Sequence, residues 1–252
     1  MKSPKQLNGR LALVTGASRG LGRAVAIAFA REGAQVIICG RTEGALEEVD
    51  DEIRSVGGKA TILKLDLRAG DRIDQLGPTL YQRFGKLDIF VAAAGILGPL
   101  SPLPHVTAEA WSAVIDINLN ANWRLIRTLD PLLRISDAGR AIFVTSGAAA
   151  GDTAYWGPYA VSKAGLQTLA TTYAAECATT RIQVSVINPG PMRTSMRAKA
   201  FPGEDPFTLP APDEVAPLFV DVALPSSASN GEVVSFSAWK QSQPSLTSNN
   251  DA

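Results

Sequence analysis

Histidine and cysteine are scarce in this sequence, and their scarcity excludes several kinds of site. The 252 residues include one histidine, His105, and two cysteines, Cys39 and Cys177. One histidine, flanked by Pro104 and Val106 in an expected loop, cannot build a metal site. Two cysteines do not make a secreted disulfide framework, and we expect both to be small apolar residues in or near the core.

Net charge and long apolar runs are missing as well. Lys+Arg and Asp+Glu each number 24, so the formal net charge is zero, and nothing favours nucleic acid or an acidic membrane as a partner. Segment 1–10 lacks the apolar run of a signal peptide. The longest apolar stretch, 89–100, is too short to span a bilayer and contains Gly and Pro. We therefore expect a cytoplasmic protein.

Apolar residues occur instead in short runs that alternate with helical patterns. They make up 46% of a chain that is long enough to bury a sizeable core. The short runs predict strands at 11–14, 36–39, 60–65, 89–93, 141–145, 182–187 and 232–236. The helical patterns predict helices at 22–31, 42–56, 71–84, 107–133, 155–179 and 213–224, with interruptions at Gly77-Pro78 and Pro131.

This alternation predicts βαβ units, and therefore a parallel sheet with helices on both faces. We expect a single doubly wound α/β domain over residues 1–240, followed by a flexible tail over 241–252. Ligands of such sheets bind at the carboxyl ends of the strands. The residues that follow each strand are therefore the candidates for a functional site.

A glycine-rich turn, with glycines at 16, 20 and 22, connects the first expected strand to the first expected helix. One glycine permits the tight turn, one lets the backbone approach a pyrophosphate, and one allows the helix to pack closely on the strand. The helix N-terminus adds free N–H groups and a positive dipole end. The pattern predicts a dinucleotide site, the alternative being a plain glycine turn.

The end of the second expected strand bears on the choice between NAD and NADP. A carboxylate there would bond the ribose hydroxyls and repel a 2′-phosphate. This sequence has Cys39-Gly40-Arg41 instead, and Arg19 of the glycine turn can reach the same place. Two cations without a carboxylate favour NADP(H). The alternative is that Arg41 is a solvated residue at a helix start.

Tyr159 and Lys163 stand four residues apart in an expected helix and so share one of its faces. A free phenol titrates near pH ~10, and a nearby ammonium lowers that pKa, so Tyr159 can exchange a proton with a substrate oxygen. Ser146 follows the fifth expected strand, and its hydroxyl can orient the same oxygen. The alternatives are a surface Tyr/Lys pair and a serine that caps a turn.

Taken in order, these motifs resemble the classical short-chain dehydrogenase/reductase family. The resemblance rests on Thr-Gly-x-x-x-Gly-x-Gly at 15–22, Ser146, Tyr159-x-x-x-Lys163 and the Pro189-Gly190 turn, and it covers residues 8 to 195 and loosely to 237. It implies a Rossmann-like fold and an NADP(H)-dependent oxidoreductase. Such an enzyme moves a hydride between the nicotinamide and a carbonyl or secondary alcohol. The family also forms dimers or tetramers through two long helices, which implies a homo-oligomer.

The resemblance assigns roles to individual residues. Asn118 would complete a Ser–Tyr–Lys–Asn tetrad and help place a water that relays protons to Lys163, which would also hold the nicotinamide ribose. Asp66 would bond the adenine amino group. The residues implied for the cofactor are Gly16, Ser18, Arg19, Gly20, Leu21, Gly22, Arg41, Asp66, Leu67, Ala93, Ala94, Gly95, Tyr159, Lys163, Pro189, Gly190, Met192 and Thr194.

The sequence departs from the family's pattern at two places. Ala92-Ala93-Ala94-Gly95 replaces the usual Asn-Asn-Ala-Gly, so the side-chain bonds of the asparagines are absent. The family's Asp-Gly-Gly near the C-terminus is missing, and 231–236 has Gly-Glu-Val-Val-Ser-Phe instead.

Apolar and aromatic residues mark the expected substrate side. They are Leu97, Tyr155, Trp156 and the lid-like stretch 196–210, which Arg197 and Lys199 interrupt. Such walls suit an apolar or part-aromatic ketone or aldehyde, or a 3-oxoacyl thioester. Two other functions stay open: an NAD-dependent alcohol dehydrogenase of the same family, and a non-catalytic NADP-binding sensor or scaffold.

Overall fold

A parallel sheet of seven strands forms the centre of the molecule. In the computed structural model, which describes residues 5–243, the strand order is β3-β2-β1-β4-β5-β6-β7, and every neighbouring pair is parallel. The strands are β1 (Leu11–Thr15), β2 (Gln35–Gly40), β3 (Lys59–Lys64), β4 (Ile89–Ala92), β5 (Arg140–Val144), β6 (Gln183–Asn188) and β7 (Val233–Ser235). Every residue of β1, β4 and β5 is buried, as expected for strands covered on both faces.

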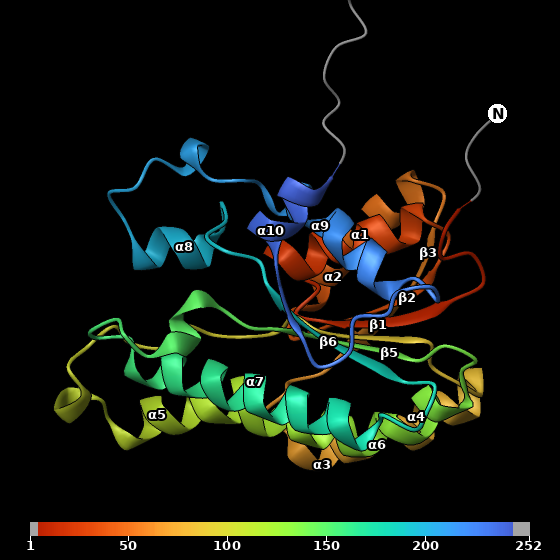
Figure 1. The fold of residues 1–252 in the computed structure, drawn as a ribbon, viewed down its shortest axis with the longest axis horizontal. Coiled ribbons are helices and arrows are strands. Elements are labelled where there is room, and N and C mark those ends of the chain that lie inside the picture. The colour runs from red at the N-terminus through yellow and green to blue at the C-terminus, as the bar shows by residue number, and fades with distance from the viewer. Residues whose placement is uncertain (1–4, 244–252) are drawn as a thin grey trace, which may run out of the picture.

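Helices cover both faces of this sheet (Figure 1). One face carries α1 (Gly20–Arg31), α2 (Glu43–Ser55), α9 (Pro212–Ala223) and α10 (Phe236–Ser242). The other carries α3 (Gly70–Asp74), α4 (Leu76–Phe84), α5 (Ala108–Ile115), α6 (Ala121–Ile135) and α7 (Gly157–Glu176). The doubly wound, Rossmann-like α/β fold expected from the sequence is confirmed.

Shorter helical segments lie in the connections. They are the 3₁₀ turns η1 (Leu103–His105), η3 (Gly147–Ala150) and η4 (Pro206–Thr208), the π-helical turn η2 (Asp116–Asn120), and the helix α8 (Ser195–Ala200). Within residues 5–243, no helix is both long and apolar enough to cross a membrane. Cys39 and Cys177 are buried free thiols, as expected.

The helices differ from expectation in several details. The long helix expected at 107–133 consists of α5, η2 and α6, and it continues past Pro131 to Ile135. The break expected at Gly77-Pro78 falls at Gln75, because a proline in the first turn of α4 removes no helical hydrogen bond. Of the expected tail, Gln241 and Ser242 end α10, and residues 244–252 lie outside the described part.

The sheet reverses its strand order between β1 and β4, which creates a crevice at their carboxyl ends. Thr15 joins the two strands there, because its Oγ1 donates to the carbonyl of Val91 at 3.2 Å and accepts from the amide of Ala94 at 3.3 Å. A Cβ on Gly16, whose φ is +68°, would lie 2.7 Å from the Ala94 Cα. Only glycine therefore permits this approach.

A buried carboxylate, Asp88, organises the opposite end of the same two strands. It accepts hydrogen bonds from the Ser136 hydroxyl at 2.6 Å and the Leu11 amide at 2.9 Å, and it pairs with Lys86 and Arg10. Burial alone would raise the pKa of Asp88. The bonds from Ser136, Leu11 and Lys86 outweigh burial, and the pKa is lowered.

Asp88→Asn is expected to lower the free energy of unfolding by about 3 kcal/mol at pH 7, because it leaves buried donors facing a neutral amide. A carboxyl whose folded pKa is depressed stabilises the protein above its unfolded pKa and loses that contribution as the pH falls through the folded value. The difference between wild type and variant should therefore shrink below about pH 4. Urea unfolding at several pH values measures it.

Asp137→Asn is the matched control, because Asp137 also pairs with Arg10 but is 69% exposed. Its cost in unfolding free energy should be much smaller than that of Asp88→Asn, because an exposed ion pair contributes little to stability. Equal costs for the two variants would contradict the role given to the buried carboxylate.

Candidate active site

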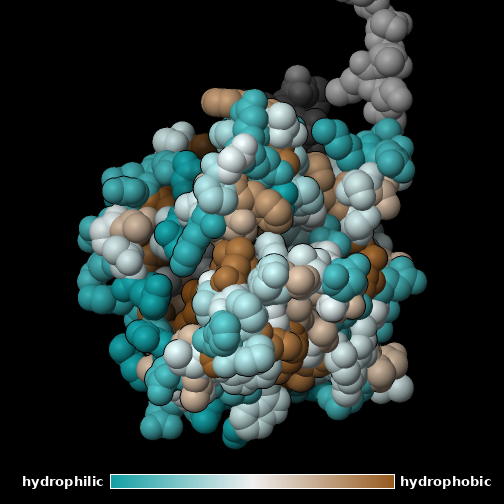
Figure 2. Space-filling model, turned by 90° about the vertical axis from the view of Figure 1, so that its left-hand side faces the viewer, coloured by the Kyte–Doolittle hydropathy of each residue, from teal (hydrophilic) through white to brown (hydrophobic). Residues whose placement is uncertain are grey.

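A cavity of about 540 Å³ opens at the carboxyl ends of the strands, where the sequence predicted a site. All of the residues expected to contact the cofactor line it. So do Ser146, Leu97 and Trp156, whereas Asn118 lies behind the wall and Tyr155 lies outside. Figure 2 faces the side that carries α8 and shows apolar side chains around a hollow in this face.

The glycine turn brings bare backbone to one wall of the cavity. A Cβ on Gly22 would collide with the carbonyl of Gly16, so the first turn of α1 packs directly on the end of β1. Arg19 occupies the N-cap position of α1 and makes no side-chain capping bond. The first N–H groups of α1 therefore keep their capacity for an anion. A pyrophosphate fits this cradle.

Two guanidinium groups stand at the next part of the wall. Arg19 and Arg41 both line the cavity and are exposed, and neither pairs with a carboxylate in the part of the chain that the structure describes. The nearest acid after β2 in the sequence is Glu43, which pairs with Lys64. The wall therefore offers positive charge and no repelling carboxylate, which suits a phosphate on the adenosine ribose.

Asp66 lines the same end of the cavity but already has a partner. The Arg68 side chain bonds both of its carboxylate oxygens, and the Arg68 amide bonds Oδ1 at 3.0 Å. The hydrogen bond from the Arg68 side chain is the main cause that lowers the pKa of Asp66 to about 2. This pairing is local and was not expected from the sequence. A contact of Asp66 with an adenine amino group stays a prediction.

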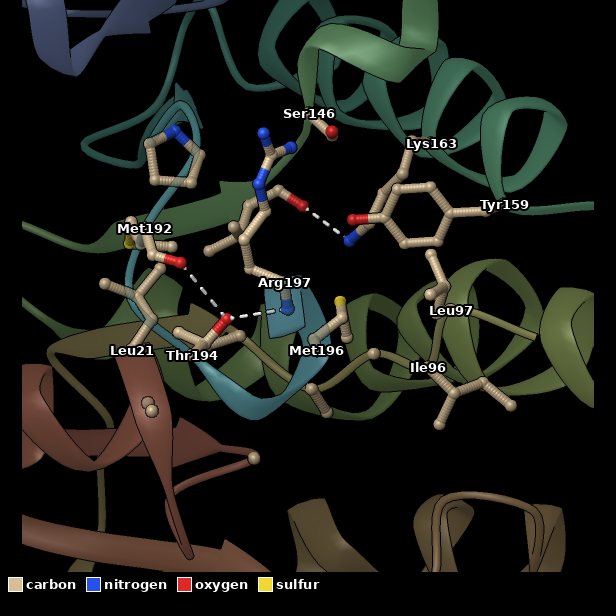
Figure 3. A pocket seen from close by; sticks show the side chains of 18 of the residues that line it. Leu21, Ile96, Leu97, Ser146, Tyr159, Lys163, Met192, Thr194, Met196 and Arg197 are labelled. Carbon is tan, nitrogen blue, oxygen red and sulfur yellow. Dashed lines mark hydrogen bonds between the residues drawn. The ribbon is translucent and has the colours of Figure 1, made fainter. Parts of the chain in front are cut away.

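Tyr159 and Lys163 come together on α7, facing the cavity (Figure 3). The Lys163 Nζ donates to the carbonyl of Val144 at 2.8 Å and lies 5.7 Å from the centre of the Tyr159 ring. Burial lowers the pKa of Lys163 to about 8. Val144 ends β5, so the strand itself holds the lysine in place, and no side-chain pattern could have indicated this acceptor.

The pKa of Tyr159 departs from expectation. Burial raises it above the ordinary value near 10, and a hydrogen bond with Ser146 offsets only part of that shift. The expectation that this pKa lies below the ordinary value is wrong for this arrangement, because burial outweighs the hydrogen bond with Ser146. Tyr159 therefore stays a protonated phenol at neutral pH.

Ser146 has the capping role that the sequence left open, and its orientation of a substrate oxygen stays a prediction. Its hydroxyl contributes to the pKa of Tyr159, and it also caps η3 by accepting from the Ala148 amide at 3.3 Å. The cap limits the directions in which the hydroxyl can point. The O–H proton remains free to be donated into the cavity.

Asn118 is fully buried in the π-helical turn η2 and fastens the loop after β4. Its Oδ1 accepts from the Ile96 amide, and its Nδ2 donates to the Ile96 carbonyl and the Ser162 hydroxyl, each at 2.9 Å. These bonds join the loop to α7 next to Lys163. The Asn120 side chain bonds Asp116, and the Asn122 side chain bonds the Asn118 carbonyl. The three asparagines thus have different hydrogen-bond partners, which the sequence alone did not indicate. The water relay stays a prediction.

The segment after β6 closes the cavity from another side. Gly190, with φ +70°, donates its amide to the side chain of Asn188 at 3.1 Å. Thr194 caps α8, and its Oγ1 accepts from the Arg197 amide at 3.2 Å (Figure 3). These bonds hold Met192 and Thr194 in the wall, as expected for residues that would face a nicotinamide.

Aromatic side chains bound the substrate end. Trp156 meets Tyr159 edge to face with ring centres 5.8 Å apart, and lies 5.8 Å from Phe201. Tyr155 is 60% exposed and does not line the cavity. Its φ of +72° places it in the turn that leads into α7. Trp156 thus lies in the cavity wall and Tyr155 outside it, and a contact of either residue with a substrate stays a prediction.

Residues 10–205 match the family described as short chain dehydrogenase. The uncharacterized oxidoreductase YciK of Escherichia coli K12 is 39% identical over 222 residues, which cover 86% of this chain and 88% of that protein. A Mycobacterium tuberculosis protein named as an uncharacterized NAD-dependent oxidoreductase is 35% identical over 204 residues, which cover 75% of this chain and 74% of that protein.

Solved structures share the whole fold. A Shigella flexneri short chain dehydrogenase complexed with NADP has a TM-score of 0.89 at 36% identity and covers 93% of this chain and 100% of its own. One from Escherichia coli CFT073 complexed with NADPH has the same TM-score of 0.89 and identity of 36%, with 93% and 99% covered. With its glycine turn and its Ser/Tyr/Lys group in one cavity, this chain belongs to the short-chain dehydrogenase family of oxidoreductases.

Proposed function

We propose that this protein is an NADP(H)-dependent carbonyl reductase, which interconverts a ketone or aldehyde and its alcohol. One observation carries the proposal: a buried Tyr159–Lys163 pair with Ser146 lines the same cavity as an anion cradle and two guanidinium groups, which have no ion-pair partner among residues 5–243. The complexes of similar proteins with NADP and NADPH support the cofactor.

Each part of the cavity fits a part of this cofactor. The glycine turn and the start of α1 would hold the pyrophosphate, Arg19 and Arg41 the 2′-phosphate, and Lys163 the nicotinamide ribose. When bound, the cofactor supplies or accepts the hydride. The protein supplies binding, orientation and the proton.

The proton chemistry follows from burial. Tyr159 stays protonated at neutral pH, so its hydroxyl can donate to the oxygen of a carbonyl substrate. Ser146 would orient that oxygen with its own O–H. As the tyrosine gives up its proton, the charged Lys163 would stabilise the phenolate.

A second candidate has one specific observation in its favour. The relative from Mycobacterium tuberculosis is named NAD-dependent, and an NAD-dependent alcohol dehydrogenase would use the same catalytic group. A non-catalytic sensor would need the cradle but not a buried lysine beside a tyrosine. A cytoplasmic location and a homo-oligomer formed through α6 and α7 stay predictions.

Tyr159→Phe removes only the hydroxyl that would donate the proton. We expect kcat for a reducible ketone to fall about 100- to 10,000-fold, while NADPH binding changes little. Tyr173→Phe is the control, because it removes the hydroxyl of another α7 tyrosine, which bonds Asp130 instead. Turnover and a fluorescence titration measure the two effects, and wild-type turnover by Tyr159→Phe would refute the assignment.

Carbonyl reduction should lose efficiency as the pH rises through about 8. Lys163 loses its charge there, whereas Tyr159 keeps its proton to higher pH because its pKa is raised. A profile of kcat/KM from pH 6 to 10 with saturating NADPH tests this expectation. Lys163→Arg keeps the charge, so its descending limb should move upward or vanish. A flat wild-type profile would contradict the assigned role of Lys163.

Arg41→Ala should weaken NADPH binding about tenfold or more and leave NADH binding nearly unchanged, because only NADPH carries the 2′-phosphate. Arg31→Ala, at the exposed end of α1, is the control for a lost surface charge. Parallel fluorescence titrations give the four constants. A wild-type preference for NADH that persists in Arg41→Ala would favour the NAD-dependent alternative.

A further inference from the structure

Arg197 stands apart from the other charged residues of the cavity. Among the described residues that line it, Arg19, Arg41 and Asp66 surround the adenosine end, and Lys163 belongs to the catalytic group. Arg197 alone brings charge to the apolar end, where Leu97, Trp156, Met196 and Phe201 form the wall. In the view of Figure 3 its side chain rises between Met192 and Tyr159.

Glu204 and Phe201 both contact the guanidinium of Arg197. Its Nε and Nη2 each donate to a carboxylate oxygen of Glu204 at 2.6 Å, and its Cζ lies 3.7 Å from the centre of the Phe201 ring. Glu204 does not line the main cavity. It lines a second cavity behind it, together with Arg197 and Phe201. Both partners are about three-quarters buried, with side chains 25% and 27% exposed.

The fork geometry is the arrangement in which a guanidinium binds a carboxylate most specifically. Glu204 takes two of the five N–H donors of Arg197 and places a negative charge beside the guanidinium, so the pair brings no net charge to the substrate end. A substrate anion would therefore meet a compensated charge at Arg197 and not a free cation. Phe201, which also lines the cavity, stacks on this guanidinium and lies against Trp156.

We propose that Glu204 masks Arg197 and thereby makes the site select uncharged carbonyl compounds with an apolar or aryl group over anionic ones. Arg197 and Glu204 are then specificity-determining residues of the lid that contains α8. This inference rests on the proposed function, and it adds the charge of the substrate, which that function leaves open.

Glu204→Gln tests the mask, with ethyl benzoylformate as the uncharged probe and benzoylformate as its anionic counterpart. Wild type should reduce the ester with at least about tenfold higher kcat/KM. In Glu204→Gln the ratio of ester to anion should fall about tenfold, chiefly through a lower KM for the anion. Both kcat/KM values are measured on the same variant. Changes in its folded fraction or cofactor affinity therefore affect both values equally and cancel in the ratio.

Two further variants distinguish charge compensation by Glu204 from a purely structural effect of the ion pair on the lid. The double variant Arg197→Met with Glu204→Gln lacks the cation, so its ratio should return to the wild-type value or exceed it. Asp74→Asn removes the carboxylate of a comparably exposed pair, Asp74–Arg124, which does not line the cavity. Its ratio should equal that of wild type. An unchanged ratio in Glu204→Gln, or a wild type that prefers the anion, would overturn the proposal.

A binding measurement distinguishes this proposal from the proposed function. If wild type reduces neither probe, the reductase assignment fails on these substrates, and the mask is tested by calorimetry with benzoate and benzamide on the NADP-loaded protein. Glu204→Gln should tighten benzoate about tenfold and leave benzamide unchanged. Equal effects on both, or no benzoate binding by the variant, would overturn the mask.

Discussion

The contact between the ends of β1 and β4 is the constraint on which the site depends. Thr15 bonds the backbone on the β4 side twice, and Gly16 lies against Ala94 with no room for a Cβ. This contact sits where the strand order reverses, so the loops on either side diverge and leave a cavity between them. The glycine turn, the loop after β4 and the start of α1 all take their positions from it.

Burial then sets the acid–base properties of the Tyr159–Lys163 pair. The same low-polarity surroundings raise the pKa of Tyr159 and lower that of Lys163. A protonated phenol thus stands beside an amine that is near its titration point. Asn118 fixes the neighbouring loop through three hydrogen bonds, and the Val144 carbonyl holds the lysine. The acid–base properties therefore arise from packing of separate elements and not from the Tyr/Lys spacing alone.

The lid after β6 uses a different principle, which is charge compensation. Its one cation in the cavity wall is paired from behind by Glu204 and stacked on Phe201. Both side chains are about one-quarter exposed, so water and salt screen this pair less than a fully exposed one. The substrate end therefore combines apolar walls with a cation that Glu204 compensates. At the adenosine end, in contrast, Arg19 and Arg41 have no carboxylate partner among the described residues.

The sequence by itself determined the alternation of strands and helices, the doubly wound fold, and the residues after each strand that line the cavity. These features follow from the periodicity of apolar residues and from the positions of the glycines, both of which are local properties of the sequence. Only the tertiary structure decided the direction of the Tyr159 pKa, the hydrogen-bond partners of Asn118, and the position of Tyr155 outside the cavity. It alone also paired Arg197 with Glu204. Burial and hydrogen bonds between distant segments cause these features, and the spacing of neighbouring residues predicts neither of them.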